Sequence, residues 1–286
     1  MGLAECQGEV CVDELELAVD EIGPWTEIKL DIVREYAAAY SRILAAQRPE
    51  FHHLYVDAFA GLGVHLSRQS GDFVLGSPLN ALLVKPPFEE YHFIDLDSAR
   101  VSQLRELVAE RSNCYPHYGD CNKVLLEEIL PLCEWGDRRR ALWLLDPYSY
   151  NYHWAVVEAA GRKRSVEVFF NFPIMAINRT VGQRDRSRVS NESRSRMTAF
   201  WGDDSWTEVV HSATGSLFEE YKQKASGSSI VDAYRVRLRT VAGFGHVSEA
   251  LPMRNTKGGV VYYLLFASQK PVAAKIVRDI FAKYKR

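Results

Sequence analysis

The stretch Leu54-Tyr55-Val56-Asp57-Ala58-Phe59-Ala60-Gly61-Leu62-Gly63 decides the fold. It begins as an apolar run of strand length and ends in a loop with two glycines. Glycine lets a backbone turn tightly and approach a ligand where any Cβ would collide. Such a strand and loop are typical of nucleotide-binding α/β proteins, although a plain strand–helix turn would also explain two glycines. The third glycine of the dinucleotide fingerprint is absent, which disfavours a dehydrogenase.

Strand and helix patterns alternate after this stretch. Short apolar runs predict further strands at 91–95, 114–118, 141–145 and 166–170. The continuous run Ala141–Leu145 is typical of a strand buried on both faces. Helical spacings separate the runs. Five strands joined by crossovers predict a Rossmann-like α/β fold, in which a parallel sheet carries helices on both faces.

The two ends of the chain extend this core. Pro24 suits the first turn of a helix, and the apolar residues after it recur at helical spacing: Trp25, Ile28, Ile32, Tyr36, Tyr40 and Ile43. Near the C-terminus, residues 246–253 and 260–267 predict an antiparallel hairpin around a glycine-rich loop. We therefore expect a seven-stranded domain over residues 24–286, with a polar insertion at 174–228 after strand five and a loosely held acidic arm at 1–23.

Composition limits the class of protein. Apolar residues make up 47% and charged residues 25% of the 286-residue chain, the balance of a folded soluble domain. The net charge of −2 argues against nucleic-acid binding over the whole surface, but it leaves a local basic patch open. Residues 1–23 are acidic, unlike a signal peptide, and no apolar run is long enough to span a bilayer. We expect a cytoplasmic protein without a membrane partner.

The five cysteines form no C-x-x-C pair. Reduced thiols in the core and in helices explain them best, so we expect no metal site. A three-sulfur site is a less favoured alternative; it would use Cys114, Cys121 and Cys133.

Polar residues follow four successive predicted strands, at the edge where open parallel sheets bind ligands. Asp57, Phe59, Gly61 and Gly63 lie in the first loop. Asp95 ends the second strand, where an acid accepts hydrogen bonds from the hydroxyls of a ribose. Its neighbour Asp97 is interpreted as a helix cap.

The third and fourth loops add Asp120 and the segment Asp146-Pro147-Tyr148. Asp120 would accept from the amine of an adenine, but helix capping explains it equally well. Asp146 would accept from a target amine while Tyr148 forms a wall on which a flat substrate stacks. The alternative for Asp146 is again a helix cap.

Taken together, these loops resemble the motifs of class I S-adenosylmethionine (SAM)-dependent methyltransferases. More closely, the chain resembles the TcmP family, the three-Cys-motif partner proteins. The points of likeness are Trp25-Thr26-Glu27-Ile28-Lys29-Leu30, Gly76-Ser77-Pro78, Leu145-Asp146-Pro147-Tyr148 and residues 253–268. The resemblance implies SAM as cofactor and a partner protein that bears a three-cysteine cluster and resembles radical-SAM enzymes.

One motif departs from the pattern of methyltransferases that act on the amines of bases. Their fourth loop has the form (D/N)-P-P-(Y/F), whereas Asp146-Pro147-Tyr148-Ser149 lacks the second proline. Tyr148 or Tyr150 would then have to supply the aromatic wall. This departure leaves a second interpretation open, a non-catalytic partner that keeps the fold and serves a radical-SAM-like enzyme in nucleic-acid modification or repair.

Six arginines lie within 18 residues after the fifth predicted strand: Arg179, Arg184, Arg186, Arg188, Arg194 and Arg196. Arginine binds phosphates in a forked geometry. We therefore hypothesise that this segment contacts the backbone of DNA or RNA beside the cofactor, with Trp201 and Trp206 near it for stacking. A solvated loop is the alternative. The leading hypothesis is methyl transfer to an amine of a nucleic acid or nucleotide-like substrate.

Overall fold

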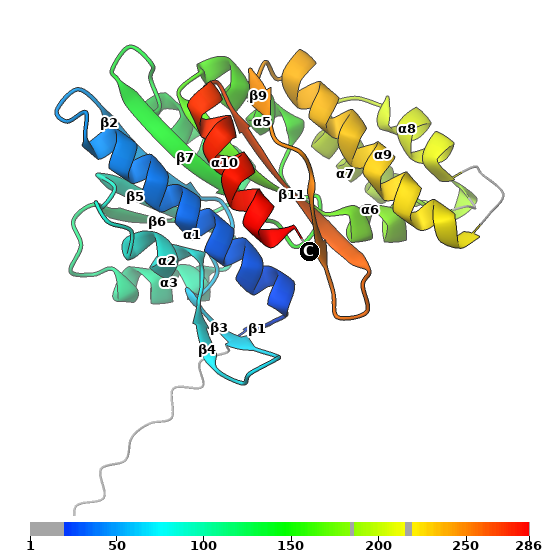
Figure 1. Cartoon of the computed structure of the whole chain (residues 1–286), viewed down its shortest axis with the longest axis horizontal. Helices are drawn as coiled ribbons and strands as arrows, with labels where there is room; N and C mark the ends of the chain where they lie inside the picture. The colour runs from blue at the N-terminus through cyan, green and yellow to red at the C-terminus, as the bar shows by residue number, and fades with distance from the viewer. Residues whose placement is uncertain (1–19, 184–185, 215–218, 286) are drawn as a thin grey trace, which may run out of the picture.

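The structure is a computed structural model that describes residues 20–183, 186–214 and 219–285. A central sheet crosses the molecule and helices cover both of its faces (Figure 1). The strands lie in the order β10-β11-β8-β7-β2-β5-β6, and the short β9 pairs with the end of β11. Strands β8, β7, β2, β5 and β6 are parallel, whereas β11 is antiparallel to β8 and β10 is antiparallel to β11. The predicted fold class is confirmed.

The strands of this sheet match the predicted runs to within two residues at most ends. They are β2 (His52–Asp57), β5 (Glu90–Asp95), β6 (Cys114–Tyr118), β7 (Arg139–Leu145), β8 (Val166–Phe172), β9 (His246–Val247), β10 (Leu251–Arg254) and β11 (Val260–Ser268).

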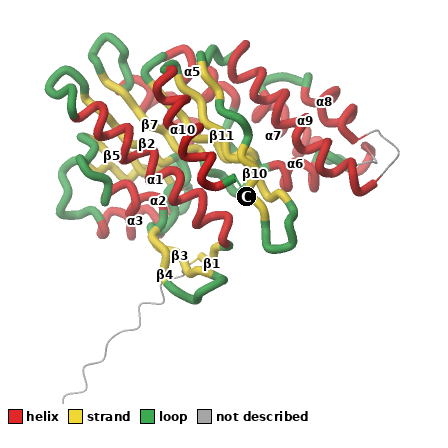
Figure 2. Tube along the Cα trace, viewed as in Figure 1, coloured by secondary structure: helices red, strands yellow, loops and turns green. Residues whose placement is uncertain are grey.

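The helices occupy the segments before, between and after these strands, as the colouring of Figure 2 shows. They are α1 (Pro24–Ala45), α2 (Ser77–Leu82), α3 (Ser98–Leu107), α4 (Cys121–Val124), α5 (Trp154–Lys163), α6 (Ile174–Thr180), α7 (Asn191–Trp201), α8 (Trp206–Thr214), α9 (Glu219–Thr240) and α10 (Pro271–Tyr284). A short π-helix spans Leu125–Ile129, and 3-10 helices span Leu130–Leu132 and Arg186–Arg188.

Two apolar clusters hold the sheet between the helices. Alternate residues of β7 face opposite sides, so Trp143 lies in the cluster under α5 and α9, while Leu144 lies in the cluster under α1 and α10. This is the pattern expected of a strand buried on both faces. Helix α10, which the sequence patterns did not predict, lies beside α1 and completes the cover of that face (Figure 1).

The buried face of α1 differs in part from the predicted stripe. Ile32, Tyr36 and Tyr40 are buried as expected, but Ile28 and Ile43 are 37% and 39% exposed. The buried face instead begins with Lys29, which lies one helical turn before Ile32 and two turns before Tyr36. This rotation places a lysine against the sheet.

The N-terminal and C-terminal segments also differ from expectation. Residues Asp20–Ile22 of the predicted loose arm form a strand, β1, that pairs with β3 (Val64–Ser67); β3 in turn pairs with β4 (Phe73–Leu75). Residues 1–19 lie outside the described part. At the other end, the first arm of the predicted hairpin is interrupted into β9 and β10, and β11 lies between β8 and β10.

The described part of the predicted insertion at 174–228 packs into the core. Met197, Phe200 and Trp201 of α7 are at most 1% exposed and belong to the cluster that also contains Phe172 of β8. Helix α9 continues from this segment to Thr240. None of the helices in the described ranges is both long and apolar enough to cross a membrane.

Candidate functional site

Polar side chains gather at the carboxyl edge of the sheet, at the point where the strand order reverses. From β2 the chain moves to β5 and β6 on one side and then returns to β7 on the other side of β2. Ligands of open α/β sheets bind at such a switch point. Asp57 ends β2, and Asp146 directly follows β7, so the two acids flank it.

A hydrogen bond joins the first and second loops. The backbone N–H of Gly61 donates to Oδ2 of Asp95 at 3.0 Å, and the N–H of Asp97 donates to Oδ1 at 2.8 Å. Gly61 has a φ of +64°, and a Cβ built on it would meet no atom within 4 Å. Asp95 is partly exposed, and each carboxylate oxygen can accept a second hydrogen bond. Gly61 and Asp95 therefore face a common open space.

Asp57 lies beneath this space and is fully buried. Its Oδ1 accepts from the N–H of Phe59 at 3.2 Å, whereas its Oδ2 has no hydrogen-bond partner in the described part of the chain. Burial raises the pKa of this carboxyl to about 7, and the nearby Ser77 side chain and the N–H of Phe59 offset only part of that rise. A cationic group of a ligand would find an unsatisfied oxygen here.

Gly63 lies behind the loop. Its carbonyl accepts from the N–H of Gly76 at 2.6 Å, and a Cβ on Gly76 would come within 2.9 Å of the Gly63 backbone. A Cβ on Gly63 itself would touch Leu79 and Leu107. The structure thus gives Gly63 a packing role that connects the loop to α2.

Two further acids cap helices. Asp97 accepts from the N–H groups of Ala99 and Arg100 at the start of α3, as predicted. Asp120 accepts from the N–H and side-chain amide of Asn122 at the start of α4, which is the capping alternative considered for it. Cap hydrogen bonds use only part of the acceptor capacity of a carboxylate, so adenine recognition by Asp120 stays a prediction.

Asp146 has two partners from distant segments. Its Oδ2 forms an ion pair with Lys29 of α1, whose side chain is 6% exposed, and its Oδ1 accepts from the amide of Asn171 on β8 at 2.7 Å. Asp146 does not cap a helix, since α5 begins only at Trp154 with His153 as its N-cap. The capping alternative for Asp146 is therefore wrong.

Lys29, Asn171 and His65 are site residues that sequence reasoning missed. His65 on β3 has a buried Nδ1 without a hydrogen-bond partner among the described residues. Burial, followed by the positive charge of Lys29, lowers the pKa of His65. A signal existed for Lys29, because it precedes Ile32 and Tyr36 by three and seven residues and so falls on the buried face of α1. None existed for His65, whose short strand has no recognisable pattern.

The two tyrosines of the fourth loop have opposite environments. Tyr148 is 81% exposed, and its hydroxyl donates to Asp20 of β1 at 3.1 Å. Asp20 also pairs with Arg100 at the start of α3, so β1 bridges the loops after β5 and β7. Tyr150 is buried and donates to Thr180. Tyr150 therefore cannot serve as a substrate wall, whereas Tyr148 remains available.

The predicted stacking role of the two tryptophans is wrong. Trp201 and Trp206 are 1% and 2% exposed, because α7 and α8 bury their rings against the core. Of the arginines, Arg184 lies outside the described residues, and of Arg186 only the backbone, in a short helical turn, is described. Arg179 and Arg188 are exposed, and Arg196 donates to Asn151 at 2.8 Å beside the fourth loop.

These features fit SAM as a ligand. Open space at Gly61, free acceptor capacity on Asp95 and an unsatisfied buried oxygen on Asp57 match the needs of a nucleoside that carries an ammonium group. Leu96, 73% exposed beside Asp95, offers apolar surface next to the position predicted for the ribose.

Comparison with solved structures agrees with the fold. Protein LPL1258 from Legionella pneumophila, of the family model DUF519, matches with a TM-score of 0.50 at 12% identity, over 90% of this chain and 92% of that one. The methyltransferase domain of bacterial CtHen1 matches with a TM-score of 0.36 at 9% identity, over 83% and 99% of the two chains. A geranyl diphosphate methyltransferase in complex with SAM matches with a TM-score of 0.32 at 13% identity, over 82% and 85%.

At these identities the likeness shows the fold alone. The chain has a class I methyltransferase-like fold. No family model and no curated protein matches the sequence. The resemblance to the TcmP family therefore has no support beyond the motifs themselves, and it stays a prediction.

Asp57 makes the stability of the protein depend on pH. Its pKa is about 7 when folded and near the ordinary 3.8 when unfolded, so between these values the folded state binds an extra proton. The stability contributed by this proton is full below about pH 4 and is lost as the pH rises through 7. Asp57→Asn should leave the free energy of unfolding nearly unchanged at pH 4 and raise it by roughly 1–4 kcal/mol at pH 8.

Urea unfolding at pH 4, 6 and 8 measures this difference, with Asp97→Asn at the surface as control. Parallel pH profiles for Asp57→Asn and the wild type would contradict the assignment.

Proposed function

We propose that this protein binds SAM at the carboxyl edge of the sheet and transfers the methyl group to an amine of a nucleic acid or nucleotide-like substrate. The observation that carries the proposal is the Asp95 carboxylate. It accepts from the Gly61 backbone and still faces open space, and the switch-point acids Asp57 and Asp146 lie beside it. The antiparallel β11 between β8 and β10 favours a methyltransferase over a dehydrogenase, whose sheet continues with parallel strands.

The residues around the cofactor would each hold one part of it. Asp95 would accept from the ribose hydroxyls, and Oδ2 of Asp57 would accept from the ammonium group, which would favour the ionised form of that carboxyl. Bound SAM supplies a methyl group on a positively charged sulfur. The protein's own task is to align the acceptor nitrogen with that methyl and to exclude water.

Asp146 and Tyr148 would hold the substrate. The carboxylate of Asp146 is fixed by Lys29 and Asn171, and its oxygens retain lone pairs for the hydrogens of an amine. The exposed ring of Tyr148 offers a face for stacking by a flat base. The neutral imidazole of His65 is a base in the same group of side chains, suited to accept the proton that leaves a methylated amine.

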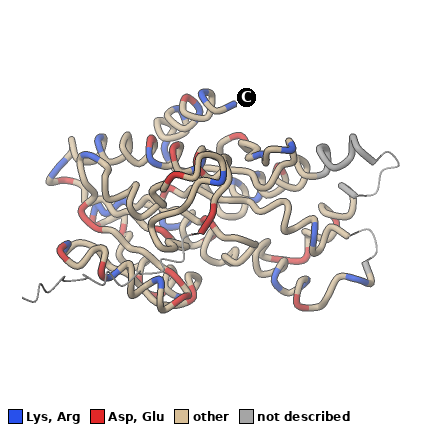
Figure 3. Tube along the Cα trace, turned by 90° about the horizontal axis from the view of Figure 1, so that it is seen from below, with Lys and Arg blue, Asp and Glu red and all other residues tan. Residues whose placement is uncertain are grey.

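The arginine segment supports a nucleic acid as the source of this base. Arg179 lies in α6, which directly follows β8, and Arg196 contacts the fourth loop at the carboxyl edge. Elsewhere, Lys and Arg are intermingled with Asp and Glu along the chain (Figure 3). Binding would thus depend on a local patch, as the net charge of −2 requires.

A second candidate is a SAM-binding partner without catalytic activity. It is favoured by the intramolecular contacts of the substrate groups, because Lys29 occupies one oxygen of Asp146 and Asp20 binds the hydroxyl of Tyr148. In that case the protein would serve the three-cysteine, radical-SAM-like enzyme that the TcmP resemblance implies. SAM binding without methyl transfer to any nucleic acid would favour this candidate.

SAM binding tests the cofactor site first. Asp95→Ala should weaken the affinity for SAM by roughly 10- to 100-fold, because a carboxylate that accepts two hydroxyls contributes about 1–3 kcal/mol. Asp97→Ala removes a helix cap two residues away and should leave affinity unchanged. Isothermal titration with SAM, S-adenosylhomocysteine, NAD and ATP measures this. Tighter binding of NAD than of SAM, or an equal loss of SAM affinity in the two variants, would contradict the proposed cofactor site.

Methyl transfer tests the role of Asp146. With labelled SAM and DNA, RNA or free nucleotides, Asp146→Asn should reduce the rate by roughly 100-fold, the cost of misplacing a reacting group by about 1 Å. SAM affinity should not change. Removing one partner of a buried pair leaves an unpaired charge, so Lys29→Met/Asp146→Asn serves as a second, better-folding variant. Full activity in both variants would exclude Asp146 from the substrate site.

Salt dependence tests the arginine segment. Each phosphate contact that is lost should lower the slope of log affinity against log salt by about 0.9 for duplex DNA. The quadruple glutamine variant replaces Arg179, Arg184, Arg186 and Arg188. A control replaces four exposed cations of α1 and α10: Arg34, Arg42, Lys275 and Arg278. Fluorescence anisotropy from 50 to 300 mM salt should show a reduced slope for the first variant alone. Equal slopes would indicate that the segment is only solvated.

A further inference from the structure

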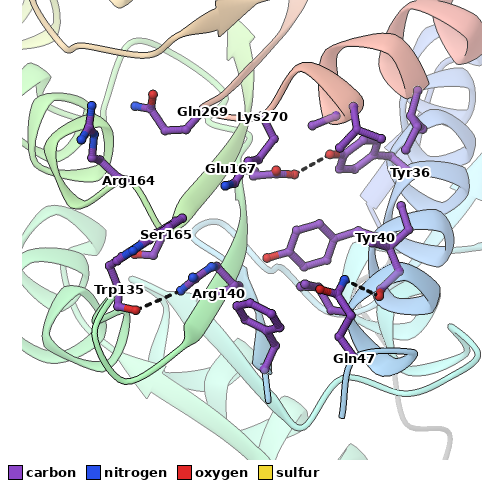
Figure 4. Close-up of a pocket in the computed structure, with 16 residues that line it drawn as sticks. Tyr36, Tyr40, Gln47, Trp135, Arg140, Arg164, Ser165, Glu167, Gln269 and Lys270 are labelled. Carbon is purple, nitrogen blue, oxygen red and sulfur yellow. Dashed lines mark hydrogen bonds between the residues drawn. The ribbon is translucent and has the colours of Figure 1, made fainter. Parts of the chain in front are cut away.

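A pocket lies at the amino edge of the sheet, opposite the proposed cofactor site. It has a volume of about 240 Å³ and is enclosed by the second half of α1, the starts of β7 and β8, and the start of α10 (Figure 4). The side chains that matter for its chemistry are Tyr36, Tyr40, Trp135, Arg140, Glu167 and Lys270. Strand β7 has seven residues, so this pocket lies about 20 Å from the carboxyl edge. It is therefore separate from the proposed cofactor site.

The hydroxyl of Tyr40 is aimed into this pocket without a partner. Tyr40 is only 7% exposed, and its oxygen makes no hydrogen bond to any described residue. In Figure 4 the hydroxyl points to the space between Arg140 and Glu167. Leaving a buried hydroxyl unsatisfied costs about 1–3 kcal/mol. An acceptor atom of a ligand would remove that cost.

Positive charge exceeds negative charge around this space. The guanidinium of Arg140 stacks over Trp135 at 3.7 Å and over Phe51 at 4.8 Å, and its hydrogen bonds go to backbone carbonyls. Lys270 lies 4.7 Å from the centre of the Trp135 ring. Within the described ranges, neither cation has a carboxylate at ion-pair distance.

The one carboxyl group that lines the pocket among the described residues is already engaged. Glu167 accepts from the hydroxyl of Tyr36 and, at 2.9 Å, from the hydroxyl of Ser268. Burial raises its pKa, which favours the neutral form. Lys270 lowers this pKa in part through its charge, but among the described residues neither Lys270 nor Arg140 forms an ion pair with a carboxylate. The pocket therefore presents these two of its lining cations and an unpartnered hydroxyl donor to a ligand.

The entrance is apolar. Ile43, Trp135 and Val272 line the pocket and are 39%, 42% and 53% exposed, although each is a large apolar side chain. Exposed apolar surface around a pocket with polar groups at its base is characteristic of a ligand site. Tyr36 and Tyr40 add aromatic walls from α1.

We propose that this pocket binds a small anion with an aromatic body, of the aromatic carboxylate class. The carboxylate accepts from the Tyr40 hydroxyl and pairs with Arg140 and Lys270, and the ring lies among Tyr36, Ile43 and Val272. The inference does not depend on the proposed methyl transfer, because the two sites share no lining residue.

The test uses 2-naphthoate, with neutral 2-naphthamide and cationic 2-naphthylmethylamine as matched probes. Isothermal titration against the full chain should give a submillimolar Kd for the carboxylate and at least tenfold weaker binding of the amide and the amine. Tyr40→Phe removes one oxygen atom and should weaken naphthoate binding by at least fivefold, while the protein melts at the same or a higher temperature.

Two arginine variants complete the test. Arg140→Met keeps an unbranched chain against Trp135 and should weaken naphthoate binding by at least tenfold, whereas Arg42→Met, on the exposed face of α1, should not change it. Equal affinity for all three probes would indicate an apolar patch alone and would overturn the proposal. Undiminished naphthoate binding by Tyr40→Phe and Arg140→Met, or no binding at millimolar concentration, would overturn it as well.

Discussion

The central strands are apolar on both faces, and this constraint organises the rest of the molecule. Strand β7 places Trp143 against one layer of helices and Leu144 against the other. Polar groups have few places within such a sheet, because each buried one needs a hydrogen-bond partner. Chemistry is therefore confined to the two edges of the sheet, where strands end and loops begin.

Helix α1 connects these two edges. It runs from the carboxyl edge, where Lys29 pairs with Asp146, to the amino edge, where Tyr40 lines the pocket described above. Tyr36, between them, donates to Glu167 of β8 from the same face of the helix. One helix face thus supplies a cation to one site and hydroxyl groups to the other. Its position on the sheet is held by the apolar contacts that Ile32 and Val33 make in between.

Electrostatics at the carboxyl edge depend on burial. The side chains of Lys29 and Asp146 are buried as an ion pair, and the charge of each compensates the desolvation of the other. Asp57 has no such partner for Oδ2 among the residues that the structure describes, and its pKa rises to about 7 as a result of burial. A buried acid with an unsatisfied oxygen is costly for stability, and such costs are common at functional sites.

The strands and the loops that follow them could be predicted from the sequence, because apolar runs, glycine loops and helix caps are local patterns. Asp57, Asp95 and Asp146 were predicted as site residues for this reason, and the interpretation of Asp97 as a helix cap is confirmed. Which aromatic side chains remain accessible depends on distant helices instead. Tyr148 and Tyr150 are two residues apart, yet only Tyr148 is exposed, since α6 and α7 bury Tyr150. Trp201 and Trp206 are buried for the same reason.

The sequence by itself determined the fold class and the edge at which the predicted cofactor residues lie, since both follow from the order of strands and crossovers along the chain. Only the tertiary structure decided the partners of the site residues. Lys29 pairs with Asp146, 117 positions away in the sequence. Strand β11 lies between β8 and β10, and residues from four separate elements line the amino-edge pocket. These contacts depend on which surfaces pack together, and no local spacing of residues encodes that choice.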